Sequence, residues 1–115
     1  MAQACCYSEA DHHQHEGLIN TTRVLLVELL LWQAQPDFQN EARMHSIREA
    51  RSILARMLHR SSVLKFILGR ILEGLYADAC QHVCEQKKLA MDYFPTHCPY
   101  ALNDILSPIF WPKLP

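Results

Sequence analysis

The chain has 115 residues, the size of a single domain and too short for two independent cores. Half of the residues are hydrophobic, 20% are charged, and only 3 glycines and 6 prolines occur, which disfavours a turn-rich all-β chain. The net charge of −1 excludes a strong attraction of the whole molecule for nucleic acid or anionic membranes. The chain contains 5 cysteines but no secretory signal or apolar segment of ~20 residues, so we expect a cytoplasmic protein with free thiols.

The N-terminal segment and the first helix differ sharply in pattern. Residues 1–17 are polar and rich in histidine, cysteine and acids, so we expect a disordered lead-in before a single helical domain over 18–115. The first helix is predicted over 18–35, capped by Asn20 or Thr21 and ended by Pro36. Residues 24–32 are apolar almost all round, apart from Glu28, and such a helix must be covered on several sides.

Two further long helices follow. One is predicted over 41–59 behind a cap at Asp37 or Asn40, and the other over 63–87 behind Ser61 and Ser62. A short helix over 101–106 lies among prolines 95, 99, 108 and 112, and its apolar residues can fold back over the long helices. The fold class is therefore all-α: a small bundle of three main helices with a short C-terminal helix and a proline-rich clasp.

Basic residues gather in the middle of the chain. Residues 43–70 contain one acid, Glu49, and seven basic residues: Arg43, Arg48, Arg51, Arg56, Arg60, Lys65 and Arg70. Arginines on a helix can contact phosphates, but these project around the helix, and neither a helix-turn-helix nor stacking aromatics accompany them. The pattern favours a solvated face or docking to acidic protein segments, with a nucleic-acid accessory role as the alternative.

Several motifs along the chain carry a family resemblance. They are Leu30-Leu-Trp32-Gln-x-Gln-Pro36, Ser46-Ile-Arg-Glu-x-Arg51, Tyr76-Ala-Asp-Ala79, Phe94-Pro-x-x-Cys98-Pro-Tyr100-x-Leu102 and Phe110-Trp-Pro112. In this order and spacing the chain resembles, from about Leu18 to its C-terminus, the bacterial family known as domain of unknown function number twenty-nine. The resemblance implies a compact helical fold and no particular activity, cofactor or catalytic residue.

Two departures from the family pattern lead to an expectation about partners. The resemblance implies a longer N-terminal helical region, which residues 1–17 do not match, and a histidine where this chain has Glu28. Without those helices the broad apolar face of the first helix needs other cover, so we expect a second copy or a protein partner. The residues expected at this interface are Leu25, Leu29, Trp32, Arg48, Arg51 and Arg56.

Three sets of side chains are candidates for chemistry. Cys80 and Cys84 share a helix face and could form a zinc site with His97 and Cys98, although buried structural cysteines explain the same pattern. Cys5, Cys6, His12, His13 and His15 have no spacing typical of a structural metal site. Glu28 near Arg48 or Arg51 is either a buried general base or an ion pair that fixes the helix register.

No complete catalytic set accompanies these residues, and no cofactor is expected. The sequence therefore favours a non-catalytic protein-interaction or oligomerisation module. A nucleic-acid accessory protein is the alternative, and a cysteine and histidine metal-binding protein is a third hypothesis.

Overall fold

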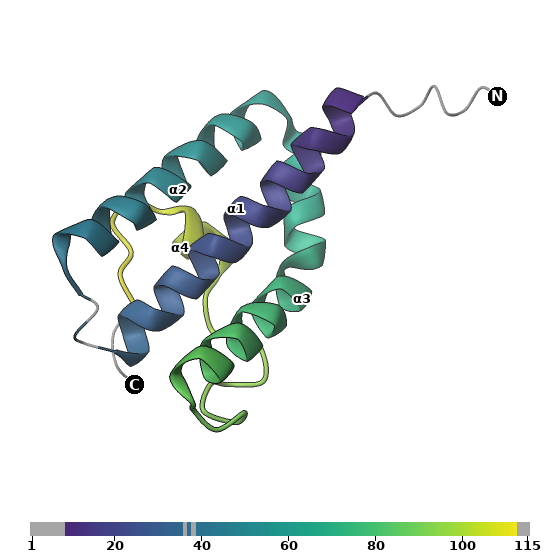
Figure 1. Cartoon of the computed structure of the whole chain (residues 1–115). Coiled ribbons are helices and arrows are strands. Elements are labelled where there is room, and N and C mark those ends of the chain that lie inside the picture. Colours follow the sequence, from purple (N-terminus) through teal and green to yellow (C-terminus); the bar gives the residue numbers. More distant parts are fainter. Residues whose placement is uncertain (1–8, 36, 38, 113–115) are drawn as a thin grey trace.

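The computed structural model describes residues 9–35, 37 and 39–112, with side chains from residue 16 onward. Its elements are α1 (Glu9–Ala34), α2 (Glu41–Arg60), α3 (Ser62–Lys87) and α4 (Leu102–Leu106), and no strand occurs in these ranges. Three long helices and one short helix confirm the predicted all-α bundle (Figure 1).

The start of α1 differs from the prediction. The helix begins at Glu9 rather than near residue 18, so the expectation of an irregular lead-in is wrong for residues 9–17, and residues 1–8 lie outside the described ranges. Leu18 is fully buried and a Cβ at Gly17 would lie 3.5 Å from Met57 of α2, so packing already anchors this part of the helix. Elongating an anchored helix adds one hydrogen bond for each residue fixed, and polar residues without an apolar stripe can join it.

Local side-chain and backbone chemistry sets the other helix ends. Asn40 caps α2, as predicted, because its side-chain oxygen accepts a hydrogen bond of 2.9 Å from the Arg43 N–H. Ser61 alone separates α2 from α3, and Lys88 ends α3 in the left-handed conformation with a φ of 57°. The turn at Ser61 therefore places the end of α2 directly beside the start of α3.

Helix α1 is the centre of the bundle. It lies between α2 and α3 and packs against both, whereas α2 and α3 contact each other little (Figure 1). Five consecutive or nearly consecutive leucines of α1 are at most 4% exposed: Leu25, Leu26, Leu29, Leu30 and Leu31. Residues 24–32 of α1, which are apolar almost all round, are therefore covered by neighbouring segments on several sides.

The C-terminal segment supplies much of this cover, as the sequence predicts. Ile105 of α4 is fully buried, and the Trp111 ring lies 4.7 Å from the Trp32 ring of α1. The Tyr100 hydroxyl donates a hydrogen bond to Gln33 of α1. Residues 94–112, which we call the C-terminal clasp, thus close the bundle over the end of α1.

None of the helices in the described ranges is both long enough and apolar enough to cross a bilayer.

Candidate functional site

The structure removes the first-helix face from the candidate interface. Leu25 and Leu29 are 0% exposed, and Trp32 is half-buried against Trp111. The expectation that Leu25 and Leu29 form a docking surface is therefore wrong, because both are buried within one chain, in a helix that packs against α2 and α3. The exposed large apolar residue of this segment is Val24, whose side chain points away from that core and is 53% exposed.

The three arginines expected at the interface occupy different environments. Arg48 and Arg56 lie exposed on α2, but Arg51 is only 4% exposed. The Arg51 Nε donates a hydrogen bond of 2.8 Å to the carbonyl oxygen of Ile105 in α4. Arg51 is therefore an internal residue that contacts the C-terminal clasp, and the accessible positive charge of α2 lies elsewhere.

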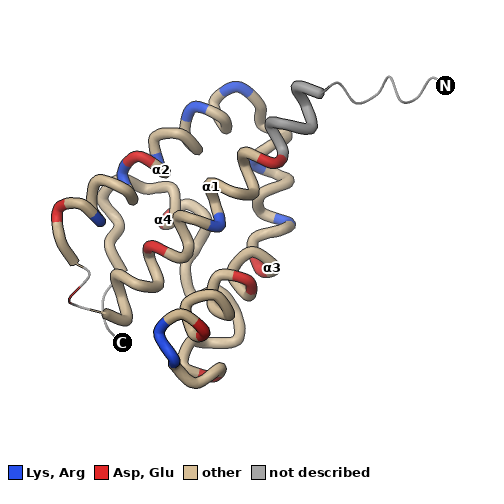
Figure 2. The backbone as a smooth tube through the Cα atoms, viewed as in Figure 1, with Lys and Arg blue, Asp and Glu red and all other residues tan. Residues whose placement is uncertain are grey.

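Accessible basic residues continue from α2 into α3. Figure 2 shows lysines and arginines spaced along α2 and the first half of α3. We call the exposed group at this end the basic corner, and its members are Arg56, Arg60, Val63, Lys65, Phe66 and Arg70. No acid occurs between residues 50 and 72, and the structure gives none of its four cations a carboxylate partner within the described ranges. Its positive charge is not neutralised locally.

Two large apolar side chains lie within the basic corner. Val63 is 61% exposed and Phe66 is 65% exposed, and the Arg70 guanidinium carbon lies 5.7 Å from the centre of the Phe66 ring. This distance is within the range of a cation–π contact, which orients the arginine over the ring. Although Arg70 lies over it, the Phe66 ring remains largely exposed.

Helical periodicity explains why these residues face outward. The buried stripe of α3 runs through Leu64, Leu68, Leu72 and Leu75. Val63 and Phe66 fall outside this stripe, and positions three and four apart share a face, so Phe66 and Arg70 project together. Sequence reasoning missed both apolar residues, although their position off the stripe was a signal that could have found them.

The turn between α2 and α3 also forms a small pocket. Met57, Arg60, Ser61 and Leu64 enclose about 110 Å³ there. This volume suits a single small side chain, and Arg60 of the basic corner lines the pocket. The basic corner therefore offers charge, an exposed ring and a shallow recess within a few residues.

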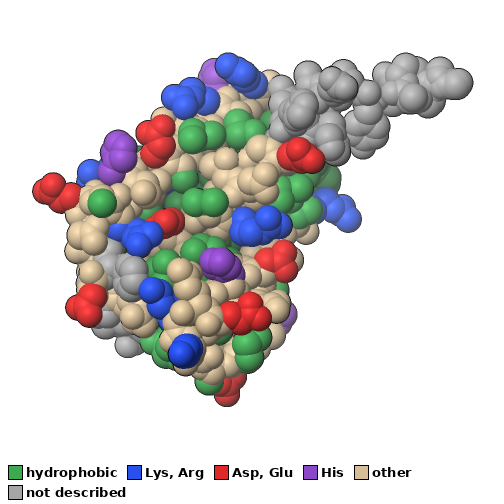
Figure 3. Space-filling view, viewed as in Figure 1, with side chains coloured by type: hydrophobic (Ala, Val, Ile, Leu, Met, Phe, Trp, Pro, Cys, Tyr) green, Lys and Arg blue, Asp and Glu red, His purple; other side chains and the backbone are tan. Residues whose placement is uncertain are grey.

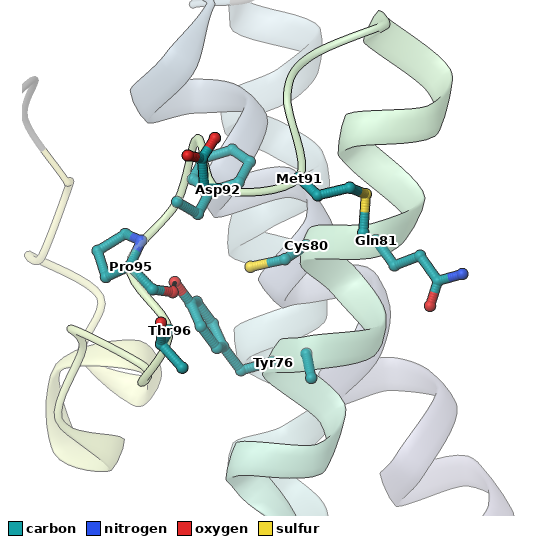
Figure 4. Close-up of a pocket in the computed structure, with 9 residues that line it drawn as sticks. Tyr76, Cys80, Gln81, Met91, Asp92, Pro95 and Thr96 are labelled. Atoms are coloured by element: carbon teal, nitrogen blue, oxygen red, sulfur yellow. Dashed lines mark hydrogen bonds between the residues drawn. The ribbon is translucent and has the colours of Figure 1, made fainter.

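A larger pocket lies between α3 and the loop formed by residues 91–96. Its volume is about 510 Å³. Figure 4 shows the Cys80 sulfur pointing toward the loop above Tyr76. The Tyr76 hydroxyl donates a hydrogen bond of 2.7 Å to the Pro95 carbonyl oxygen, so this ring holds the loop in place.

The thiols near this pocket have the properties of structural cysteines. Burial raises the pKa values of Cys80, Cys84 and Cys98 above their ordinary value of 9.0. A raised pKa keeps the thiol protonated at neutral pH, and the neutral thiol is a poor nucleophile. Cys84 donates to the Ala90 carbonyl oxygen at 3.3 Å and Cys98 to the Tyr100 carbonyl oxygen at 3.5 Å.

The structure does not assemble the proposed zinc ligands. Within the described side chains, no three histidine, cysteine or acidic residues lie close enough together to hold a metal ion. The His97 side chain is 88% exposed and lies 3.5 Å from Glu73, rather than among the cysteines. The N-terminal histidines and cysteines, Cys5, Cys6, His12, His13 and His15, lie outside the described side chains.

Glu28 forms an ion pair with a different arginine from those expected. Its carboxylate lies 2.6 Å from the Arg43 guanidinium, and both side chains are partly buried. Arg43 lies in the first turn of α2, so this pair fixes α2 against α1. The structure supports the register-fixing interpretation of Glu28 and places neither Arg48 nor Arg51 beside it.

Comparison with known proteins identifies the family of this chain but no function for it. The described part of the chain is a three-helix core closed by the C-terminal clasp, with an accessible basic corner at the turn between α2 and α3. The model of the family described as domain of unknown function DUF29 matches residues 9–111, so the chain belongs to this family. Neither a curated protein nor a solved structure matches the chain.

Proposed function

We propose that this protein is a non-catalytic interaction module that docks an acidic segment of another protein on its basic corner. The observation that supports it is the exposure of Phe66, 65%, and Val63, 61%, among four cations in a stretch without acids. A partner segment with acidic and apolar residues would satisfy both features at once.

The energetics favour a ring-centred interface. Fully burying a side chain such as phenylalanine contributes about 1.5–3 kcal/mol, and aromatic and arginine residues dominate binding energies in protein interfaces. Arg70 already lies over the Phe66 ring, so little side-chain freedom is lost when a partner covers the pair. The surrounding cations accelerate encounter with an acidic partner and set its orientation.

A protein partner fits this surface better than a nucleic acid does. Single strands bind along a series of stacking rings beside a basic groove. The basic corner has one exposed ring, and its neighbour Val63 has no π-face to stack on a base. Nucleic-acid binding through the α2 arginines is therefore the alternative, and the experiment must distinguish it from the binding of an acidic protein segment.

Fluorescence anisotropy with three labelled probes makes the separation. The probes are a peptide that alternates glutamate with leucine and tryptophan, a glutamate–glycine peptide of equal charge, and an oligothymidylate. We expect the first peptide to bind more tightly than the other two, and Phe66→Ala to weaken its binding about tenfold, which corresponds to about 1.4 kcal/mol.

The matched control is Met91→Ala. Met91 is 68% exposed on a different part of the surface, and its loss should leave peptide binding unchanged. Tighter binding of the oligothymidylate, with a steep loss at higher salt, would instead favour the nucleic-acid alternative. Equal effects of the two alanine variants would refute the assignment of the basic corner.

A further inference from the structure

Arg51 is a buried cation with most of its hydrogen-bonding capacity unused. The side chain is 4% exposed and its Nε donates to the Ile105 carbonyl oxygen at 2.8 Å. Both terminal nitrogens are buried, and no group in the described part of the chain accepts a hydrogen bond from either of them. These two nitrogens carry four N–H groups in the planar fork that matches the two oxygens of a carboxylate or phosphate.

The surroundings of Arg51 add positive charge and an aromatic cover. The Arg51 guanidinium carbon lies 5.4 Å from the centre of the Trp111 ring, and that of Arg48 lies 5.8 Å from the same ring. Neither arginine has a carboxylate partner within the described ranges. One indole of the C-terminal clasp therefore contacts two guanidinium groups whose charge the described residues do not balance.

A buried and unbalanced cation is costly, and burial alone cannot remove its charge. Desolvation lowers the pKa of Arg51, but the ordinary pKa of arginine is so high that the group stays protonated at neutral pH. Buried charges in proteins are ordinarily paired and hydrogen-bonded. The contact with Trp111 and one hydrogen bond leave this requirement incomplete, and an acceptor with negative charge would complete it.

We propose that the terminal nitrogens of Arg51 form a binding site for an oxyanion group, a carboxylate or a phosphate, beneath Trp111. The fork of Arg51 binds two oxygens of the ligand, and Arg48 adds a second positive charge at the same ring. Because both terminal nitrogens are buried, a ligand reaches them only if residues packed around Arg51 move, and Trp111 of the C-terminal clasp is one of these residues. This site is separate from the basic corner, because the described hydrogen bond and ring contact of Arg51 are with Ile105 and Trp111.

Ligand-dependent thermal stability tests this site. Melting temperatures are measured by circular dichroism at one ionic strength while sodium phosphate or sodium acetate replaces sodium chloride. We expect a rise of about 5 °C that saturates with oxyanion concentration, as binding to the folded state alone requires. A larger response to phosphate would identify a phosphate-bearing ligand, and a larger response to acetate would identify a carboxylate.

Two variants assign the response to this site. Arg51→Met removes the fork and should abolish the saturating rise, whereas Arg56→Met, an exposed arginine on the same helix, should retain it. Phosphate also stabilises proteins without binding, but that effect does not saturate and is shared by all three proteins. If Arg51→Met does not fold, Arg51→Lys keeps the charge without the fork and should weaken the apparent affinity about tenfold.

Trp111 provides a second readout that does not depend on stability. In a Trp32→Phe background Trp111 is the remaining tryptophan of the two in the chain, and its emission should change with the same midpoint as the melting temperature. An equal response of wild type and Arg51→Met, or no response beyond that to chloride, would overturn the proposal. The Arg51 nitrogens would then be satisfied without an oxyanion.

Discussion

Leu29→Ala tests whether the apolar face of α1 is an internal core or an interface. Leu29 is 0% exposed within one chain. The substitution removes three carbon atoms, which at ~0.8 kcal/mol each gives about 2.4 kcal/mol of lost transfer free energy. The cavity left behind adds to this, so we expect the free energy of unfolding to fall by about 3 kcal/mol, within the usual range for buried leucines.

Urea unfolding followed by circular dichroism measures this loss, with Val24→Ala as the control. Val24 lies on the same helix but is 53% exposed, so its truncation should cost about 0.5 kcal/mol. Light scattering should show the same solution mass for the wild type and Leu29→Ala. A loss below about 1 kcal/mol together with a lower mass for Leu29→Ala would refute the reasoning, because the side chain would then be buried by a second copy.

Three further predictions follow from single positions. Gly69→Ala should stabilise the protein by about 0.5–1 kcal/mol, because a Cβ there meets nothing within 4 Å and alanine favours the helix. If urea unfolding shows a destabilised variant instead, another surface approaches this glycine. Thr22→Val should raise the free energy of unfolding by about 1 kcal/mol, because the buried Thr22 hydroxyl has no hydrogen-bond partner among the described residues. A lower free energy of unfolding in the variant would show that this hydroxyl forms a hydrogen bond. Burial raises the pKa of Cys84, so the folded state holds that proton more strongly than the unfolded state. The stability from this thiol should be complete below pH 9.0 and should be lost as the pH rises through the raised value. Urea midpoints above pH 9.0 should fall more steeply for the wild type than for Cys84→Ala, and identical slopes would contradict this assignment.

Local patterns predicted most of the helical architecture. The break at Ser61 and the cap at Asn40 depend on residues close in sequence, and each occurs where it was expected. The start of α1 was missed because residues 9–17 have no apolar stripe. Their helical state depends on the anchored residues that follow, which a local pattern does not reveal.

The candidate site was predictable only in part. The concentration of basic residues over 43–70 was visible in the sequence, but it did not separate the basic corner from the rest of α2. The same pattern could not distinguish Arg51, which is 4% exposed, from Arg56, which is exposed. That difference arises because α4, more than fifty residues later, lies against one side of α2 and not the other.

The sequence by itself determined that the chain is helical, where its long helices break and which residues are apolar enough to be buried. These properties depend on side-chain chemistry and on hydrogen bonds within a few residues. Only the tertiary structure decided what covers each surface: the C-terminal clasp covers the apolar face of α1, the cysteines do not meet His97, and Phe66 remains outside. Burial depends on contacts between segments far apart in the chain, and their geometry is set by how the whole core packs.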